Sequence, residues 1–539
     1  MKKKYLFIFV FLISFITIFL IFLLPKEYFF NFLVHNLALE NKKEILKQQF
    51  FTAQKWQIIQ FFIFFFCLFF TIITYFLKIK IDFIRIFIRN IIIFYHSKSK
   101  KEQYFFLFFV FISIFPAFIQ LFIFPYLIDE VFAYTFLLNK GFLGIYPYYP
   151  GPNQHILFHL GSYFLSFTYI FHQNPILYLR FFAFLGFFLS VIGIGIWVWR
   201  QRNIDISVLS MLFFAYSPPI LVYSFLGRGY SWQVFLTLLN FYFLLKITNN
   251  TPQNTIYLFV FVNIIGLLII PTHLFVVGSS MLYILFSFWY KIFFFISFRI
   301  FVIVFVFYLP IILFNGFAAL LQNDWIKSIE LNSFFSLFLF HFLSIFNYLL
   351  ADFFIFFLFI FLFFGVYSYK KIVLSHQKII FFYILFPLLF CLIRVILPPE
   401  RVFTYFMIGF LYIFIQFLSV FSRRYIYLFL IIPLFFLTNH FYLFPKNSEA
   451  FIFTQKIINQ YNPKNIKIFA NQDEYQVFFR YFCIQKKIKI DIEVNNFDEK
   501  KLYHYIVFDK KRYEKKDFPI KNYEKIFENK EIIAFVLTN

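Results

Sequence analysis

Residues 104–134 read YFFLFFVFISIFPAFIQLFIFPYLIDEVFAY, and this stretch decides what kind of fold the chain adopts. Its first part, Tyr104 to Phe124, is an apolar run long enough to cross a bilayer as an α-helix, which takes about 20 residues. Two adjacent carboxylates, Asp129 and Glu130, follow closely. Because ionised carboxylates are costly in hydrocarbon, the pair is expected at the water boundary of a membrane-spanning helix.

The rest of the chain repeats this apolar character. Of its 539 residues, 62% are hydrophobic and 103 are phenylalanine, and the mean hydropathy is +0.79. No soluble domain could bury so much apolar surface, and apolar runs of about 20 residues recur along most of the sequence. The runs are continuous and do not alternate with polar residues, which favours helices over strands. The sequence therefore predicts an all-α polytopic membrane protein.

We expect about 13 membrane spans, with boundaries accurate to a few residues. They are residues 5–24, 57–77, 104–124, 176–199, 207–223, 232–246, 255–270, 272–290, 298–314, 350–369, 378–396, 403–421 and 425–443. Two further apolar segments, 156–171 and 333–349, are interrupted by histidine, glycine or asparagine. We expect the first to be an interfacial or re-entrant helix and the second to lie along the membrane surface.

Basic residues indicate the orientation of the spans, because they gather in every second connection, which the positive-inside rule assigns to the cytoplasm. They are Lys78, Lys80, Arg85, Arg89, Lys98, Lys100, Lys101, Arg200, Arg202, Lys246, Lys291, Arg299, Lys370, Lys371, Lys378, Arg423 and Arg424. The N-terminus is then cytoplasmic, and Asp129 and Glu130 are exoplasmic. The same distribution accounts for the formal net charge of +24 without a nucleic-acid partner. We expect the inner membrane of a bacterium, with the site facing the periplasm.

Composition divides the chain into three parts. Residues 1–103 predict an extra two-span unit with a basic amphipathic cytoplasmic segment, and residues 104–443 predict the transmembrane core. From 444 the sequence turns polar and charged, so residues 444–539 predict a small α/β domain on the exoplasmic side. The strands expected in it are residues 466–470, 488–494, 503–508 and 532–537, and the expected helix is 473–485.

Asp129 and Glu130 form the first candidate site. A carboxylate pair in this position is compatible with a helix N-terminal cap that gains from the helix dipole. The long exoplasmic loop that follows favours a functional role, since long ordered loops are usually functional. It contains Asn153 and His155, which could hydrogen-bond sugar hydroxyls, among tyrosines and prolines that could stack on sugar rings.

Two arginines in exoplasmic turns form a second group of candidates. Arg228 lies between two glycines and just before Tyr230, so that backbone or ligand can approach closely, and its planar guanidinium suits a phosphate. Arg401 ends the sequence Pro-Pro-Glu-Arg and could be a second phosphate ligand. The alternatives are a snorkelling Arg228 at the interface and a surface pair of Arg401 with Glu400, which would contribute little stability.

His273 is a further candidate, placed in Pro-Thr-His between two apolar runs. A lone histidine in this setting is more often a buried hydrogen-bonding residue than a ligand. The sequence contains no Walker motif, no dinucleotide-binding fingerprint and no HExxH. Its three cysteines show neither a disulfide framework nor zinc spacing.

These elements follow one another in a defined order along residues 104–443. The order is Asp129-Glu130, Asn153-Gln-His155-Ile-Leu, Arg180, Ser217-Pro218, Tyr223-Ser224, Gly227-Arg228-Gly229-Tyr230-Ser231, Thr272-His273 and Pro398-Pro399-Glu400-Arg401. In this order they resemble the GT-C superfamily of glycosyltransferases, in the branch of protein O-mannosyltransferases and bacterial lipid A aminoarabinose transferases. Two features depart from that pattern: the His-Pro-Pro element of the loop is altered, and the two N-terminal spans are additional.

The resemblance implies a GT-C-like core that takes a sugar from a polyprenyl-phosphate donor and passes it to a lipid, glycan or protein acceptor on the exoplasmic side. It implies that Asp129 is the general base or acceptor-orienting carboxylate, with Glu130 beside it. Arg228 and Arg401 then bind the lipid phosphate, and Asn153, His155, Tyr230 and His273 line the substrate site. Some relatives need a divalent metal, but beyond Asp129-Glu130 the sequence shows no dedicated carboxylate cluster. No other cofactor is implied, and the surrounding partner is membrane lipid.

Three other functions remain open at this point. One is a polymerase or ligase of polyprenyl-linked glycans, which shares the lipid donor and the large exoplasmic loops. Another is a flippase or transporter, which should carry charges buried in mid-span and internal repeats. The third is an inactive scaffold that presents the C-terminal domain. The gathering of candidate charges at one water boundary favours the transferase.

The predicted topology can be tested by fusing a reporter after Asn539. Since every second connection is basic, we expect a reporter that works only outside the cytoplasm to be active there. Activity of a cytoplasmic reporter at the same position, with an inactive exoplasmic one, would contradict the topology and the side assigned to the site.

Overall fold

The structure of the protein is a computed structural model, and it describes most of the chain from Ile81 onward. The described residues are 27, 30–31, 34, 81–146, 149, 154–168, 174–248, 251–287, 290–316, 331–353, 355, 359, 374–421, 423–441, 448–461, 465–470, 473–493, 502–509, 522–528 and 532–537. The predicted spans 5–24 and 57–77 and most of 350–369 lie outside them, as does the candidate residue Asn153.

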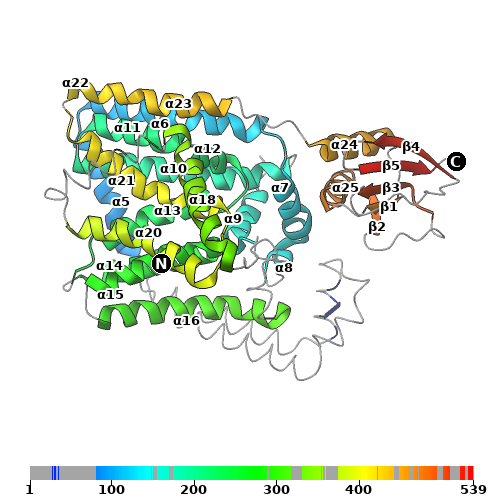
Figure 1. Cartoon of the computed structure of the whole chain (residues 1–539), viewed down its shortest axis with the longest axis horizontal. Coiled ribbons are helices and arrows are strands. Elements are labelled where there is room, and N and C mark those ends of the chain that lie inside the picture. Colours follow the sequence, from blue (N-terminus) through cyan, green and yellow to red (C-terminus); the bar gives the residue numbers. More distant parts are fainter. Residues whose placement is uncertain are drawn as a thin grey trace. The chain divides into compact units, whose positions relative to one another are not determined.

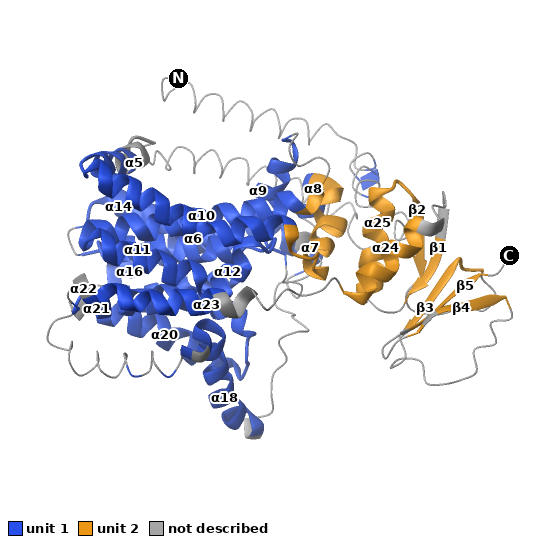
Figure 2. Cartoon of the chain, turned by 90° about the horizontal axis from the view of Figure 1, so that it is seen from above, with its two compact units in different colours: residues 1–122, 142–173, 177–443 blue, residues 123–141, 174–176, 444–539 orange. Residues whose placement is uncertain are grey.

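Two compact units make up the chain (Figure 2). Unit 1 contains Met1–Phe122, Phe142–Gln173 and Leu177–Leu443, and unit 2 contains Ile123–Gly141, Asn174–Ile176 and Phe444–Asn539. The segment with Asp129 and Glu130 thus belongs to the same unit as the C-terminal residues. The functional division at 103 and 443 stays a prediction.

Unit 1 is helical, with the elements labelled in Figure 1. Its longer helices are α5 (Ile81–His96), α6 (Lys100–Ile123), α9 (Ile156–Ser166), α10 (Pro175–Gln201), α11 (Ile204–Tyr216), α12 (Pro218–Phe225), α13 (Tyr230–Leu244), α14 (Gln253–Ile269), α15 (Leu274–Ser287), α16 (Tyr290–Asn315), α18 (Leu331–Leu350), α20 (Leu374–Arg394), α21 (Met407–Leu418) and α23 (Ile431–Phe441). Shorter pieces are α8 (Gly141–Ile145), α22 (Arg423–Ile426) and the 3₁₀ segments η5 (Pro271–His273), η6 (Ala351–Phe353), η7 (Glu400–Phe406) and η8 (Tyr427–Leu430).

Six helices among the described residues are long and apolar enough to cross a membrane. They are Lys100–Ile123, Pro175–Gln201, Tyr290–Ile312, Ser333–Leu350, Gln377–Arg394 and Glu400–Leu418. The expected membrane-embedded helical protein is therefore supported, whereas the number of 13 spans stays a prediction. The segment expected along the membrane surface, 333–349, has the length and composition of a span. Helix α9 has 11 residues and is shorter than a span.

Helices α11 and α12 form a seventh candidate span that is bent by 68°. The bend falls at Ser217, just before two prolines that begin α12. A proline lacks the backbone N–H needed to continue the preceding helix but fits the first turn of a new one, so the chain changes direction at this point. Helix α12 ends after eight residues, and a short turn carrying Arg228 leads into α13.

A buried amide holds four helices of unit 1 together. Asn240 of α13 donates to Asn263 Oδ1 of α14 at 2.6 Å, and its own Oδ1 accepts from Ser280 of α15 and Tyr383 of α20. Asn263 in turn donates to the carbonyl of Phe259. Within hydrocarbon such groups must find partners inside the protein, so this network fixes the mutual placement of α13, α14, α15 and α20.

Unit 2 contains a mixed five-stranded sheet in the order β2-β1-β3-β5-β4. Its strands are β1 (Asn465–Ala470), β2 (Lys489–Glu493), β3 (Tyr505–Asp509), β4 (Tyr523–Glu528) and β5 (Ile532–Leu537). Strand β1 pairs in parallel with β2 and β3, whereas β5 is antiparallel to β3 and β4. The four expected strands and the expected helix, α25 (Asp473–Gln485), are present. Strand β4 and helix α24 (Glu449–Tyr461) were not anticipated.

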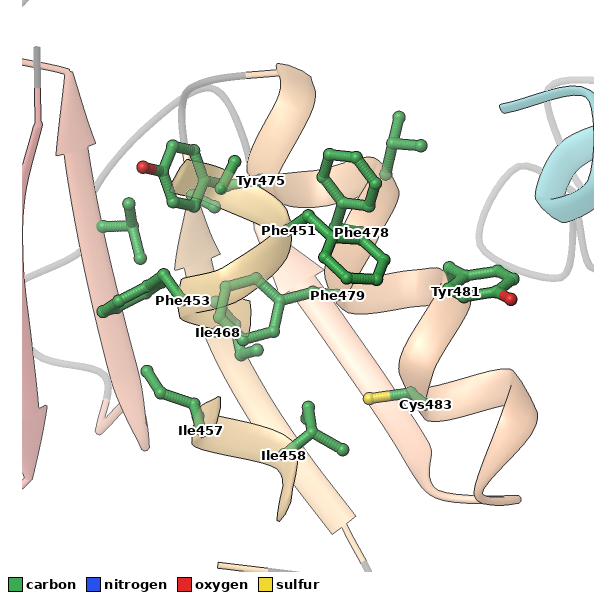
Figure 3. Close-up of a cluster of buried hydrophobic side chains, with 14 of the residues drawn as sticks. Phe451, Phe453, Ile457, Ile458, Ile468, Tyr475, Phe478, Phe479, Tyr481 and Cys483 are labelled. Carbon is green, nitrogen blue, oxygen red and sulfur yellow. The ribbon is translucent and has the colours of Figure 1, made fainter. Parts of the chain in front are cut away.

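Helices α24 and α25 pack together and share a hydrophobic cluster with the sheet (Figure 3). Phe451 and Phe478 meet edge to face with ring centroids 5.4 Å apart. The remaining elements of unit 2 come from the N-terminal half of the sequence: α7 (Ile128–Phe132), the π-helical η2 (Ala133–Leu137) and the short η3 (Leu138–Lys140). Val131 of α7 and Ile176 of α10 belong to the same cluster.

Candidate functional site

The sequence-predicted site residues fall into both units. Asp129 and Glu130 lie in unit 2, and the other described candidates lie in unit 1. Within unit 1, His155, Arg228 and Tyr230 are buried, and Arg401, which is partly buried, acts electrostatically on His155. We define this set of four, with His159 and Tyr223, as the arginine cluster.

Arg228 is presented by the turn between α12 and α13. Its backbone N–H donates to the carbonyl of Leu226 at 2.6 Å, and only 8% of the residue is exposed. The next residue, Gly229, lies close to two neighbours. A Cβ on it would be 3.1 Å from His155 Nδ1 and 3.3 Å from the carbonyl oxygen of Ile269. A Cβ at this position would therefore be in tight contact, and its neighbours would have to move by a few tenths of an ångström. The glycine therefore sets the position of Arg228.

His155 contacts the turn between α12 and α13. It precedes α9 and accepts a hydrogen bond at Nδ1 from the Gly229 backbone N–H, at 3.0 Å. Because Nδ1 accepts, the proton of the neutral ring is on Nε2. The ring meets Tyr230 edge to face, with centroids 5.7 Å apart and planes at 85°. Two predicted site residues are thus in direct contact.

His159 joins the cluster one helical turn after His155. The two rings are stacked at 6.0 Å with planes 14° apart. His159 is 1% exposed, and within the described part of the chain neither of its ring nitrogens has a hydrogen-bond partner. The sequence analysis did not select His159 as a site residue. The available signal was its spacing of four residues from His155, which places both side chains on one helix face.

Both imidazoles are neutral in the folded protein. Burial, the nearby positive charge of Arg228, the neighbouring His159 and the charge of Arg401 lower the pKa of His155 well below its usual value. Burial and Arg228 lower the pKa of His159 to about 3. A low-dielectric site next to cations disfavours further positive charge. The positive charge of the cluster therefore comes from its arginines, and the imidazoles serve as neutral hydrogen-bonding groups.

Arg401 reaches the same cluster from η7, a distant part of the sequence. Its guanidinium acts electrostatically on His155, as does that of Arg228. The preceding residue, Glu400, is held by α18: Ser344 donates to its Oε1 at 2.7 Å, and His341 Nδ1 lies 4.0 Å from the same oxygen. These contacts fix the start of η7, the segment that carries Arg401.

Hydroxyl groups complete the surroundings of the two arginines. Tyr223 and Tyr230 pack with ring centroids 4.5 Å apart, and Tyr348 of α18 hydrogen-bonds with Tyr223 and Thr404. A cavity of about 10 Å³, with room for no more than one water molecule, is lined by Tyr223, Tyr230, Ser190, Ser231 and Thr404 together with apolar side chains. The arginine cluster thus combines guanidinium groups, phenol hydroxyls and neutral imidazoles, although the arginines and imidazoles do not line this cavity.

His273 is a packing residue in this structure. It is fully buried, and its ring lies against α14 so closely that a Cβ on Gly266 would be 2.2 Å from its Cδ2. In the described residues its ring nitrogens have no hydrogen-bond partner. Nearby, Gln233 donates to the hydroxyl of Thr272 at 3.3 Å. The role of His273 as a substrate-site residue stays a prediction.

The carboxylates of unit 2 differ in their surroundings. Glu130 is 1% exposed, and one of its oxygens accepts the backbone N–H of Leu127 at 3.4 Å, as a helix-capping side chain does. Asp129 is partly exposed. The capping interpretation of the pair therefore describes Glu130, while the catalytic role of Asp129 stays a prediction. No group of three or more His, Cys, Asp or Glu suited to a metal occurs in the described residues.

No protein-family model matches the chain, and no curated protein is significantly similar to it. The resemblance to GT-C glycosyltransferases therefore rests on the order of the motifs in the sequence.

The buried imidazoles predict a pH-dependent stability. An unfolded histidine gains a proton near pH 6.5, whereas His159 resists protonation down to about pH 3. The contribution of His159 to the free energy of unfolding is thus fully present above pH 6.5. It decreases as the pH falls, by up to about 2 kcal/mol at pH 5. We expect the thermal midpoint to fall less between pH 7.5 and 5 in His159→Gln than in the wild type. His96→Gln, at an exposed histidine, is the control, and equal slopes for wild type and His159→Gln would contradict the prediction.

Proposed function

We propose that the chain is a membrane glycosyltransferase that moves a sugar from a polyprenyl-phosphate donor to an acceptor on the exoplasmic side. The observation that supports the proposal is that Arg228 and Arg401 both act electrostatically on His155. The two arginines lie far apart in the sequence, in different turns, and act on one buried imidazole. Such a concentration of guanidinium charge among neutral hydrogen-bonding groups suits a phosphate.

The setting favours a lipid-borne phosphate over a soluble one. The arginine cluster is surrounded by apolar helices, several of which are long enough to cross a membrane. A ligand with an apolar tail and a phosphate head could place the tail among lipids and the head at the two arginines. Sugar on that phosphate would meet the hydroxyls of Tyr223 and Tyr230 and the neutral imidazoles.

The proposed reaction is a single displacement at the anomeric carbon, as the family resemblance implies. The acceptor oxygen forms a bond to that carbon while the bond to the phosphate oxygen breaks. The phosphate leaves as an anion, so no strong acid is required, and Arg228 and Arg401 stabilise the charge that develops on it. The proton of the acceptor goes to a carboxylate, for which Asp129 is proposed on the strength of the sequence resemblance.

The phosphate role predicts that Arg228→Lys impairs transfer far more than its retained charge suggests. Lysine keeps the charge but loses the planar two-pronged geometry, and loss of one such transition-state contact typically lowers kcat by about 10²–10³-fold. Arg401→Ala is expected mainly to raise the KM for the donor. The assay is sugar transfer by purified protein from a polyprenyl-phosphate sugar.

Arg202→Lys is the matched control, because Arg202 is exposed and its guanidinium donates to Gln416, away from the cluster. It should behave like the wild type. If Arg228→Lys binds and turns over the donor as the wild type does, Arg228 is an interfacial anchor and the phosphate role is wrong.

The proton-handling role predicts a different pair of effects in unit 2. Asp129→Asn keeps size and shape but removes the basic oxygen, so transfer should fall by about 10²–10⁴-fold with the protein still folded. Glu130→Gln should cost less, because an amide oxygen can still accept the Leu127 N–H. Activity and thermal stability are measured in parallel. Near-wild-type transfer by Asp129→Asn would exclude the role, and lost stability with normal activity per folded molecule would indicate a cap.

A further inference from the structure

The helix that carries Asp129 and Glu130 is too short to be stable alone. Helix α7, the π-helical η2 and the short η3 follow one another from Ile128 to Lys140, a helical run of 13 residues that changes its hydrogen-bond pattern twice. Isolated helices shorter than about 12–15 residues are marginal in water, and most helix stability in proteins comes from packing. The position of these carboxylates must therefore be set by what α7 and η2 pack against.

Within unit 2, that partner is helix α25 of the C-terminal part. Helix α25 packs against both α7 and η2. Val131 of α7 is fully buried in the cluster formed by α24, α25 and the sheet, with Phe132, Tyr134 and Phe136 against it. The segment that carries the carboxylates thus packs on a hydrophobic cluster whose helices α24 and α25 lie more than 300 residues later in the sequence.

One tyrosine of α25 contacts this segment on both sides of the carboxylates. The Tyr481 ring lies 6.1 Å from that of Tyr126, which precedes them, and 5.8 Å from that of Tyr134, which follows them; both contacts are edge to face. Tyr481 is 5% exposed. Edge-to-face pairs each contribute about 0.5–1.5 kcal/mol beyond burial, so Tyr481 joins the two ends of the short segment.

Other contacts support the same arrangement. Asn174 donates to the hydroxyl of Tyr126 at 2.9 Å, and Phe451 of α24 lies 5.7 Å from the Tyr126 ring. After the carboxylates, Gln485 donates to the hydroxyl of Tyr134 at 3.5 Å, and the guanidinium of Arg480 lies 5.7 Å from the centroid of the Phe136 ring. All of these partners belong to unit 2.

We propose that the C-terminal part of unit 2 is the positioning element of the Asp129–Glu130 helix, with Tyr481 as the principal positioning residue. In this role, the domain gives a short helical segment the support that its own length cannot supply. Its consequence for catalysis rests on the proposed function, whereas its consequence for the order of α7 does not.

Hydrogen exchange on the full-length protein tests the proposal without reference to activity. Tyr481→Ala should accelerate exchange of the amides of residues 127–137 by about tenfold or more, with the sheet strands still protected. Tyr475→Ala is the matched control: Tyr475 is also buried on α25, but its ring contacts Phe453 of α24 at 5.8 Å. Figure 3 shows Tyr475 and Tyr481 well apart on this helix. Tyr481→Phe keeps both ring contacts and should restore protection.

Two results would overturn the proposal. One is unchanged exchange of residues 127–137 in Tyr481→Ala. The other is equal acceleration of that segment by Tyr475→Ala. If Tyr481→Ala also loses protection in the sheet, Tyr481→Leu, which keeps apolar volume but not the aromatic contacts, takes its place with the same criteria.

A kinetic measurement separates the inference from the proposed function. If the wild type transfers sugar and Arg228→Lys does not, Tyr481→Ala should lower kcat with little change in the donor KM, because the arginine cluster is untouched. Normal kcat in a variant whose α7 amides exchange faster would overturn the catalytic consequence. Absence of transfer in the wild type would refute the proposed function, and the exchange experiment would still decide the inference.

Discussion

The hydrogen bond from the Gly229 backbone N–H to His155 Nδ1 is the contact on which the arginine cluster depends. It joins the turn that presents Arg228 to the residue that precedes α9, and glycine suits this position because a Cβ there would be in tight contact with His155 and Ile269. It also settles the tautomer of His155, leaving the Nε2 proton available to a ligand.

The apolar surroundings strengthen every polar contact of this kind. A buried polar group that lacks a partner in the protein has no water to bind instead, and the Asn240 network and the His155 contact are both buried interactions. The same low dielectric keeps His155 and His159 neutral beside the arginines. A site built in this way combines concentrated positive charge with neutral donors and acceptors. That combination connects the membrane setting of the protein with its proposed phosphate chemistry.

Unit 2 shows how far apart in sequence the parts of a small structural unit can lie. The segment after α6 supplies two carboxylates and apolar side chains such as Val131 and Phe132. Helices α24 and α25 supply the hydrophobic cluster on which these side chains pack, but no part of the arginine cluster. Composition revealed the polar C-terminal segment, its four expected strands and α25, because alternation and charge are local signals. Strand β4 was not anticipated because YEKIFE is rich in charge and is recognisable only through its pairing with β5.

By itself, the sequence determined that this is a helical membrane protein, because continuous apolar runs leave no other way to satisfy the backbone in lipid. It also identified the glycines beside Arg228, since glycine between polar residues signals close approach. Only the tertiary structure decided that His155 is the residue that lies against Gly229 and that His159 stacks on His155. It also decided that His273 packs against Gly266 and that Glu130 caps α7. The physical reason is range: hydrophobicity and turn chemistry act on neighbours in the chain, whereas hydrogen bonds and ring contacts join residues that only the packing of helices brings together.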